Sequence, residues 1–160
     1  MDLDDLSMQV GQALLAHKLV LTTAESCTGG WVAQVVTQTS GSSQWFDRGF
    51  VTYTNEAKQE MLGVSGETLQ RYGAVSEQTV KEMADGALNH SHAQVSIAIS
   101  GVAGPTGGTA EKPVGMVCFA WAGQGSTQTS TQYFQGDRTQ VRLQSVQYAL
   151  RRLIALIKDS

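Results

Sequence analysis

The chain has few charged residues, and this scarcity argues against several classes of protein. Only 16% of its 160 residues are Asp, Glu, Lys or Arg, against about 25% in an average soluble domain. The 11 basic and 14 acidic side chains leave a net charge of −3, which provides no general attraction for nucleic acid or for an anionic membrane. An anionic ligand would have to be bound locally, by backbone N–H groups or by a few well-placed cations.

Long apolar runs and metal-binding patterns are also missing. No hydrophobic run approaches the roughly 18–20 residues of a membrane helix, and the acidic start MDLDD is unlike a secretory signal, so we expect a cytoplasmic protein. Cys27 and Cys118 lie far apart without a C-x-x-C pattern, which supports neither a disulfide framework nor a zinc site. We interpret His90 and His92 as part of a polar cluster at a helix end rather than as metal ligands.

The order of the expected elements is that of a layered α/β domain. Helical spacing of apolar residues predicts helices over 6–15, 31–36, 56–62 and 77–89, and a long closing helix after Asp137. Strands are predicted over 19–25, 49–54, 95–100, 114–123 and 126–134. The last two strands form an antiparallel hairpin, and the strand 95–100, which is almost wholly apolar, is central. Helices alternating with strands, plus one hairpin, indicate an α/β fold with a mixed sheet.

Polar residues at the expected helix starts predict caps. Thr28, Asn55 and Ser76 each precede a helical pattern, and the Asp137 pattern D-R-T-Q fits a capping box. If Asn55 is the N-cap, Lys58 stands at the third helical position, where the helix dipole disfavours a cation. That potential, together with partial burial, would lower the pKa of Lys58 and make its neutral amine available as a base.

The loops that follow the strands are the candidate sites, because ligands of open α/β sheets usually bind at the carboxyl ends of the strands. The segment 25–30 places small residues and hydroxyls at a helix N-terminus. The segment 101–109 has four glycines in nine residues, but it matches neither the dinucleotide nor the P-loop signature. A flexible connection and an anion-binding loop both remain open for this segment.

A nucleophile is predicted near Tyr53 and Lys58. Tyr53 ends a strand five residues before Lys58, and a serine beside them would attack an acyl group while its proton passes to the lysine directly or through the phenol. Spacing does not identify the serine. The candidates on loops are Ser26, Ser40, Ser42, Ser43 and Ser100.

Two arginines start the closing helix. Arg138 and Arg142 are four residues apart and therefore share one helical face. They would either clamp a phosphate or only pair with Asp137 and solvate the helix.

Seven blocks of sequence, taken together and in order, resemble the CinA C-terminal domain family. The blocks are TTAESCTGGWVA, GSSQWFDRGFVTYTNEAK, LGV, GAVSEQTV, ISGVAGPTGG, KPVG and GDR, and they cover nearly the whole chain. The layout is most similar to that of stand-alone members, which are nicotinamide-nucleotide amidases. The resemblance implies one domain over 1–160 with a three-layer α/β/α sandwich. It also implies hydrolysis of the carboxamide of nicotinamide mononucleotide to nicotinic acid mononucleotide and ammonia, without a metal or other cofactor, in pyridine-nucleotide salvage.

The family's motifs also suggest functional residues. The catalytic serine would be Ser43 in GSSQWF, and its partners Tyr53 and Lys58 in VTYTNEAK. The nucleotide would be bound by Glu25, Ser26, Thr28, Gly29, Ser100, Gly101, Gly104, Gly107 and Gly108, with Arg138 or Arg142 on the phosphate. The cationic pyridinium of the substrate would tolerate the carboxylate of Glu25.

Two positions depart from the family pattern and keep an alternative open. An acidic residue often stands where this chain has Thr106, and a small polar residue where it has Met116. The alternative is a catalytically weak relative that binds a nucleotide or regulates without turnover. A phosphate-ester hydrolase is disfavoured, because no carboxylate cluster suited to Mg²⁺ stands near the loops. The sequence does not give the oligomeric state, but the hairpin with Phe119 and Trp121 is a candidate contact surface for a homodimer.

Overall fold

The computed structural model describes residues 2–123 and 125–159, which form six α-helices and a five-stranded sheet. The helices are α1 (Leu3–Ala16), α2 (Trp31–Thr37), α3 (Asn55–Leu62), α4 (Gly66–Tyr72), α5 (Glu77–Asn89) and α6 (Arg138–Lys158), with a short 3₁₀ turn η1 (Ser42–Gln44). The strands are β1 (Leu21–Glu25), β2 (Phe46–Val51), β3 (Val95–Gly101), β4 (Met116–Gly123) and β5 (Ser126–Tyr133). All the predicted elements are present, and α4 is an addition that the sequence pattern did not indicate.

The sheet is mixed, with the strand order β2-β1-β3-β4-β5. β1 runs parallel to both β2 and β3, whereas β3, β4 and β5 pair in antiparallel fashion. The central position of β3 and the β4–β5 hairpin are both confirmed. Because β1, β2 and β3 are parallel, their carboxyl ends and the loops that follow them lie at one edge of the sheet.

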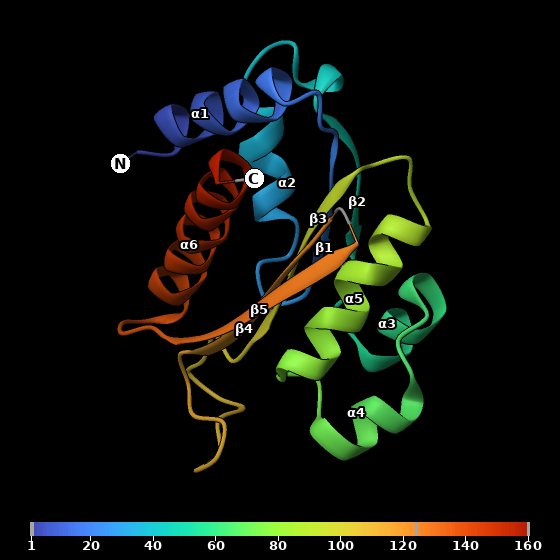
Figure 1. The fold of residues 1–160 in the computed structure, drawn as a ribbon. Coiled ribbons are helices and arrows are strands. Elements are labelled where there is room, and N and C mark those ends of the chain that lie inside the picture. The colour runs from blue at the N-terminus through green and yellow to red at the C-terminus, as the bar shows by residue number, and fades with distance from the viewer. Residues whose placement is uncertain (1, 124, 160) are drawn as a thin grey trace.

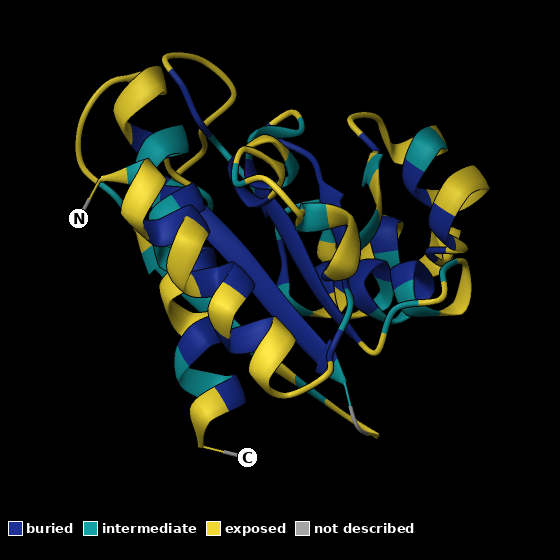
Figure 2. Cartoon of the chain, turned by 90° about the horizontal axis from the view of Figure 1, so that it is seen from above, coloured by how far each residue is buried: buried dark blue, intermediate teal, exposed yellow. Residues whose placement is uncertain are grey.

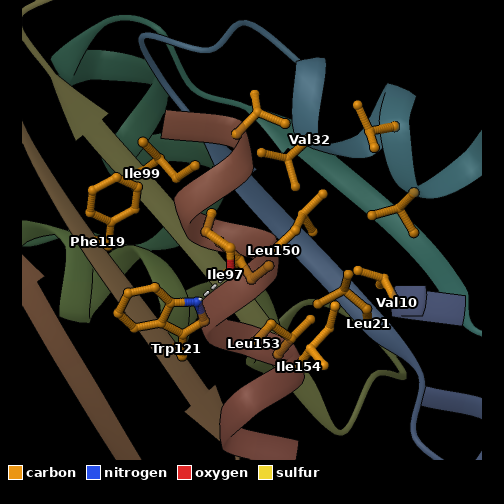
Figure 3. Close-up of a cluster of buried hydrophobic side chains, with 14 of the residues drawn as sticks. Val10, Leu21, Val32, Ile97, Ile99, Phe119, Trp121, Leu150, Leu153 and Ile154 are labelled. Atoms are coloured by element: carbon orange, nitrogen blue, oxygen red, sulfur yellow. Dashed lines mark hydrogen bonds between the residues drawn. The ribbon is translucent and has the colours of Figure 1, made fainter. Parts of the chain in front are cut away.

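The fold has three layers, as predicted. Helices α1, α2 and α6 cover one face of the sheet, and α3, α4 and α5 cover the other (Figure 1). Viewed from above, the buried strands lie between two layers of helices, and the exposed residues of these helices face outward (Figure 2). The two faces of the sheet carry different side chains. Ile97, Phe119 and Trp121 face α6 (Figure 3), whereas Ala98 and Ala120 face α5.

The aromatic residues of the hairpin belong to the core, so the prediction that they form a contact surface is wrong. Phe119 is fully buried and Trp121 is 5% exposed. The Trp121 Nε1–H donates to the carbonyl of Ala149 on α6 at 3.0 Å (Figure 3). The alternation of the strand turns both rings toward α6, where they pack with Tyr148.

The caps of two helices differ from the prediction. Helix α2 begins after Gly30 rather than after Thr28, and α3 is capped by Thr54, whose hydroxyl accepts from Ala57 N–H, rather than by Asn55. Lys58 is consequently the fourth residue of α3, not the third. The predicted cap of Ser76 on α5 and the capping box that Asp137 begins on α6 are confirmed.

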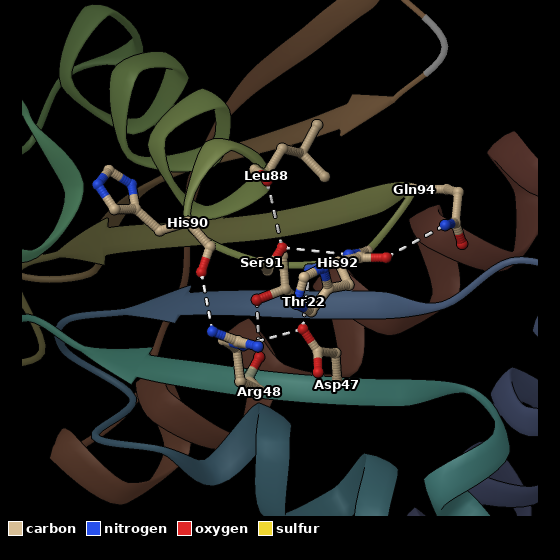
Figure 4. A network of polar contacts seen from close by, with 9 residues as sticks. Thr22, Asp47, Arg48, Leu88, His90, Ser91, His92 and Gln94 are labelled. Carbon is tan, nitrogen blue, oxygen red and sulfur yellow. Dashed lines mark hydrogen bonds and ion pairs between the residues drawn. The ribbon is translucent and has the colours of Figure 1, made fainter.

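A polar network closes the edge of the sheet where the parallel strands begin (Figure 4). The Nδ1 atom of His90 lies 2.7 Å from the carbonyl oxygen of Gly86, and the carbonyl of His90 accepts from Arg48 Nη1 at 3.1 Å. The backbone N–H of His92 donates to Asp47 at 3.0 Å and holds the pKa of that carboxyl below its usual value. The interpretation of the two histidines as a helix-end cluster is confirmed.

In the described part of the chain, no helix combines the length and the apolar character that crossing a membrane requires.

Candidate active site

A cleft of about 380 Å³ opens at the edge of the sheet where β1, β2 and β3 end. This is the edge at which the loops after the parallel strands were expected to bind a ligand. The lining residues come from the ends of the three strands, from α3, from the loop after β3, from the turn before α5 and from the start of α6. They are Ser26, Cys27, Tyr53, Asn55, Lys58, Ala74, Val75, Ser100, Gly101, Val102, Ala103, Gly104, Thr106, Gly107 and Arg138.

Ser26 and Lys58 form a hydrogen-bonded pair inside this cleft. Ser26 directly follows β1, and its backbone N–H donates to the carbonyl of Ile99 on the neighbouring strand. The Nζ atom of Lys58 donates to Ser26 Oγ at 3.1 Å, to the carbonyl of Thr52 at 3.0 Å and to the carbonyl of Tyr53 at 3.3 Å. The hydroxyl is therefore held by the turn that directly follows β1, and the amine by the carbonyls that directly follow β2.

The amine of Lys58 is almost completely buried, since the residue is 1% exposed. This burial lowers the pKa of Lys58, because the ammonium form loses its hydration. Among residues 2–123 and 125–159, no carboxylate forms an ion pair with it. The expectation of a lysine with a depressed pKa is confirmed in direction. A lysine in this state is suited to accept a proton.

Cys27, the neighbour of Ser26, has the opposite character. Burial raises the pKa of its thiol to about 12, and the nearby carboxylate of Glu25 adds to this effect. A thiol with this pKa is protonated at neutral pH and is a poor nucleophile. The nucleophile that the cleft offers next to Lys58 is thus the hydroxyl of Ser26.

Tyr53 and Arg138 meet at the mouth of the cleft. Arg138 Nη2 donates to the phenol oxygen of Tyr53 at 3.1 Å, and Arg138 Nη1 donates to the carbonyl of Gly104 at 2.9 Å. The side chain of Tyr53 is exposed, and only its backbone carbonyl contacts Lys58. Arg138 therefore joins the glycine-rich loop to the segment after β2 and leaves its charge accessible to a ligand.

The glycine-rich loop forms one wall of the cleft. Gly104 and Gly107 have φ angles of +83° and +90°, which a residue with a side chain rarely adopts. Gly101 packs so closely on β4 that a Cβ atom would lie 2.7 Å from the side chain of Val117. Within the described chain, the N–H groups of Gly104, Thr106 and Gly107 donate no hydrogen bond. Free donors of this kind suit an anionic group.

Ser100 lies at the end of β3, beside Ser26 at the end of β1. It is 2% exposed and lines the cleft, and no described group forms a hydrogen bond with its hydroxyl. Because no described group uses this hydroxyl and the residue lines the cleft, the oxygen is available to a bound substrate.

Glu25, which was predicted to bind the ligand, does not line the cleft, and its carboxylate is engaged by the protein itself. One carboxylate oxygen accepts from the hydroxyl of Thr28 at 2.6 Å and from Val32 N–H at 2.8 Å, and the other accepts from Ala33 N–H at 3.0 Å. Glu25 thus caps α2 from a distance, in place of the side chain that its N-cap Gly30 lacks.

We expect Glu25→Gln to lower the free energy of unfolding by about 2 kcal/mol, because hydrogen bonds to a buried carboxylate become weaker ones to an amide. Urea unfolding measures this change. Glu60→Gln, at an exposed position of α3, is the control and should stay within about 0.5 kcal/mol of the wild type. An equal effect of both variants would contradict the capping role.

Several other predicted residues also lie outside the cleft. Arg142 contacts backbone carbonyls of the turn after Ser26, and the hydroxyl of Thr28 is used by Glu25. Gly29 is exposed and has a φ angle of +60°, and Gly108 is exposed beyond the last lining glycine. The structure brings together Ser26, Tyr53, Lys58, Ser100, Gly101, Gly104, Gly107 and Arg138.

The prediction that Ser43 lies beside Tyr53 and Lys58 is wrong. Ser43 is exposed on η1, before β2, whereas Tyr53 follows β2. The six residues of β2 separate the two positions by about 20 Å, at roughly 3.3 Å per residue. Ser43 therefore lies at the opposite edge of the sheet.

Some lining residues were not predicted from the sequence to belong to the site. Asn55, at the first position of α3, lines the cleft, as do Ala74 and Val75 before α5. The block GAVSEQTV contains the last two, so the family resemblance was the available signal. Among residues 2–123 and 125–159, no three His, Cys, Asp or Glu side chains come together in a way that could hold a metal ion.

Comparison with known proteins places the chain in a family. The model of the CinA C-terminal domain matches residues 3–157. The nicotinamide-nucleotide amidohydrolase PncC of Escherichia coli K12 is 58% identical over 153 residues, which are 95% of this chain and 93% of that protein. The protein of the same name from Enterobacter agglomerans is 56% identical over 157 residues, covering 95% and 96% of the two chains. The chain therefore belongs to the CinA C-terminal domain family.

Solved structures agree with this assignment. The competence/damage inducible protein CihA of Agrobacterium tumefaciens has a TM-score of 0.93 at 47% identity, with 98% of this chain and 96% of that chain covered. A CinA superfamily protein of Klebsiella pneumoniae has a TM-score of 0.97 at 40% identity over the whole of both chains. The α/β fold is thus shared across the family.

Proposed function

We propose that the chain is a serine-dependent amidase that hydrolyses the carboxamide of nicotinamide mononucleotide to nicotinic acid mononucleotide and ammonia. The observation that carries the proposal is the 3.1 Å hydrogen bond between Lys58 Nζ and Ser26 Oγ inside the cleft. Relatives named nicotinamide-nucleotide amidohydrolase, at 56% and 58% identity over nearly the full chain, support the choice of substrate.

In the first half of the reaction, the neutral amine of Lys58 donates its two N–H groups to the carbonyls of Thr52 and Tyr53. Its lone pair removes the proton of Ser26 while Oγ bonds to the carboxamide carbon. The electrons of the C=O bond move to oxygen and give a tetrahedral oxyanion. When the oxyanion collapses, the C–N bond breaks, and the Lys58 ammonium returns its proton to the leaving nitrogen. Ammonia leaves, and an ester with Ser26 remains.

In the second half, water replaces ammonia. Lys58, again neutral, takes a proton from the water as it attacks the ester carbon, and the proton then passes to Ser26 Oγ as the C–O bond breaks. The products are the free serine and nicotinic acid mononucleotide. One amine thus acts as base and then as acid in both halves.

The rest of the cleft suits a mononucleotide. We assign the phosphate to Arg138 and to the free N–H groups of the glycine-rich loop, since charge-assisted and backbone donors are the usual phosphate ligands. We assign to the hydroxyl of Ser100, which lines the cleft, a contact with the carboxamide. We further propose that the reaction serves pyridine-nucleotide salvage in the cytoplasm.

The test is ammonia release by the purified protein from nicotinamide mononucleotide, nicotinamide riboside and free nicotinamide. We expect rapid release only from the mononucleotide, because binding of the remote phosphate helps to position the amide. The second candidate function is nucleotide binding without turnover. One observation favours it: Thr106, which stands where the family often has an acidic residue, lines the cleft. An increase in melting temperature with the mononucleotide, but no ammonia, would establish that alternative and refute the amidase.

Arg138→Gln should raise KM for the mononucleotide about tenfold or more and leave kcat within a few-fold. The expected reason is the loss of a charged hydrogen bond to the phosphate, which is worth about 1.5–3 kcal/mol. Steady-state kinetics with the riboside provides the internal control, since a substrate without phosphate should not distinguish the variant from the wild type. Equal losses with both substrates would mean that Arg138 does not bind the phosphate.

A further inference from the structure

Arg142 lies beside the cleft, and its contacts are with the turn that follows Ser26. Its Nε atom donates to the carbonyl of Cys27 at 3.0 Å, and its Nη2 atom donates to the carbonyl of Thr28 at 3.3 Å. The guanidinium also lies over the ring of Trp31, 5.5 Å from its centroid. The planar donor group is therefore engaged by the protein itself rather than presented to a ligand.

The contact with Cys27 fixes the direction of a peptide group. The Cys27–Thr28 bond is trans, and the N–H of a trans peptide points opposite to its C=O. The N–H of Thr28 is therefore directed away from Arg142. Within residues 2–123 and 125–159, no group accepts a hydrogen bond from it, whereas the N–H of Gly29 is used by Ser26 O at 3.0 Å. Thr28 is fully buried and is not among the lining residues of the cleft, so these contacts order the turn itself.

This turn depends on such contacts for its shape. Gly29 and Gly30 have φ angles of +60° and +100°, and glycines lose the most conformational freedom on folding. Glu25 holds the turn on one side through the hydroxyl of Thr28. Arg142, which is anchored on α6, holds the two carbonyls.

We propose that Arg142 is a positioning residue for the nucleophile. It holds the turn so that Ser26 Oγ stays beside Lys58 Nζ. The proposal rests on the amidase function proposed above. It assigns the two arginines of α6 different tasks, with Arg138 binding the phosphate and Arg142 aligning the reacting group.

The kinetic test separates these tasks. Arg142→Gln should lower kcat about 100-fold, since a shift of about 1 Å in a reacting group can cost about 10²-fold, and change KM for the mononucleotide less than about threefold. The ratio of activity on mononucleotide to riboside should stay as in the wild type, unlike in Arg138→Gln. Arg142→Lys should recover part of kcat, because an ammonium keeps the charge but lacks the planar fork. Arg151→Gln, an exposed position of α6, is the matched control and should be unchanged.

A second readout does not depend on the substrate. Labelling of Ser26 by a fluorophosphonate probe, followed by mass spectrometry, should be about 100-fold slower in Arg142→Gln, because the hydroxyl is no longer held in its reactive position. A wild-type protein that labels at Ser26 but releases no ammonia would refute the substrate and leave the role of Arg142 to be decided by the labelling rates. Thermal unfolding shows whether Arg142→Gln is folded, and if it is not, Arg142→Lys decides.

Three results would overturn the proposal. The first is wild-type kcat and labelling in Arg142→Gln. The second is a large rise in KM with kcat retained, which would make Arg142 a phosphate ligand. The third is a wild-type protein that neither labels at Ser26 nor releases ammonia, which would refute both proposals together.

Discussion

Ser26→Ala should lower kcat for the mononucleotide by about 10⁴-fold or more, since loss of an attacking hydroxyl removes the covalent route altogether. The fold should survive, because among the described residues the hydroxyl has one side-chain hydrogen bond, to Lys58 Nζ, and a 3.5 Å contact to the carbonyl of Tyr53. Coupled ammonia assays measure the loss, and the melting temperature shows that the variant is intact.

Ser43→Ala is the matched control for this variant. Ser43 is exposed and lies at the other edge of the sheet, so its removal should leave kcat within about twofold. The reverse pattern, with Ser43 essential and Ser26 dispensable, would mean that the cleft at the end of β1 is not where the amide reacts.

Lys58→Met should lower kcat about 10³-fold and affect KM much less, because general base and acid catalysis contributes about 10²–10⁴-fold. Methionine has a similar length and fills the buried space without a proton-accepting group. A large rise in KM with kcat retained would instead assign the lysine to substrate binding.

The pH profile of the wild type tests the same residue. Only the neutral amine accepts a proton, and its fraction increases with pH, so kcat/KM should rise with pH through an ionisation below the ordinary lysine value, since burial lowers the pKa of Lys58. This limb should be absent from the residual activity of Lys58→Met. A rate that is independent of pH in the wild type would contradict the role of Lys58 as base.

The layers and the place of the site follow from local patterns. The apolar run of β3 identified the central strand, and the caps at Ser76 and Asp137 located two helix starts. The rule that ligands bind at the carboxyl ends of parallel strands led to the loops that line the cleft. These features depend on periodicity and on single residues, which a sequence displays directly.

The choice of serine required the direction of the strands. Ser26 and Ser43 both lie on loops, but helix α2 carries the chain back across the sheet before the parallel strand β2 begins. A residue that precedes β2 consequently lies at the amino edge, and a residue that follows β1 lies at the carboxyl edge. The family motif indicated Ser43 without taking the direction of the strands into account. In the structure, Ser43 lies before β2 and therefore at the other edge of the sheet.

The two arginines and Glu25 show a different limit. Arg138 and Arg142 are one helical turn apart, about 5.4 Å along the axis, yet one lines the cleft and the other contacts the turn after Ser26. Glu25 caps a helix that starts six residues later, at Trp31. Such contacts depend on how α6 and α2 pack on the sheet, and spacing along one element does not determine them.

Lys58, the proposed base, is held by residues that follow the outer strand β2. β2 is an outer strand with partly exposed residues, and the carbonyls of Thr52 and Tyr53 that hold Lys58 directly follow it. Margins of a fold open at lower free energy than the interior does. Gentle warming or dilute urea would therefore abolish activity by opening β2 and the segment that follows it, while the central strands and the helices packed on them are still folded.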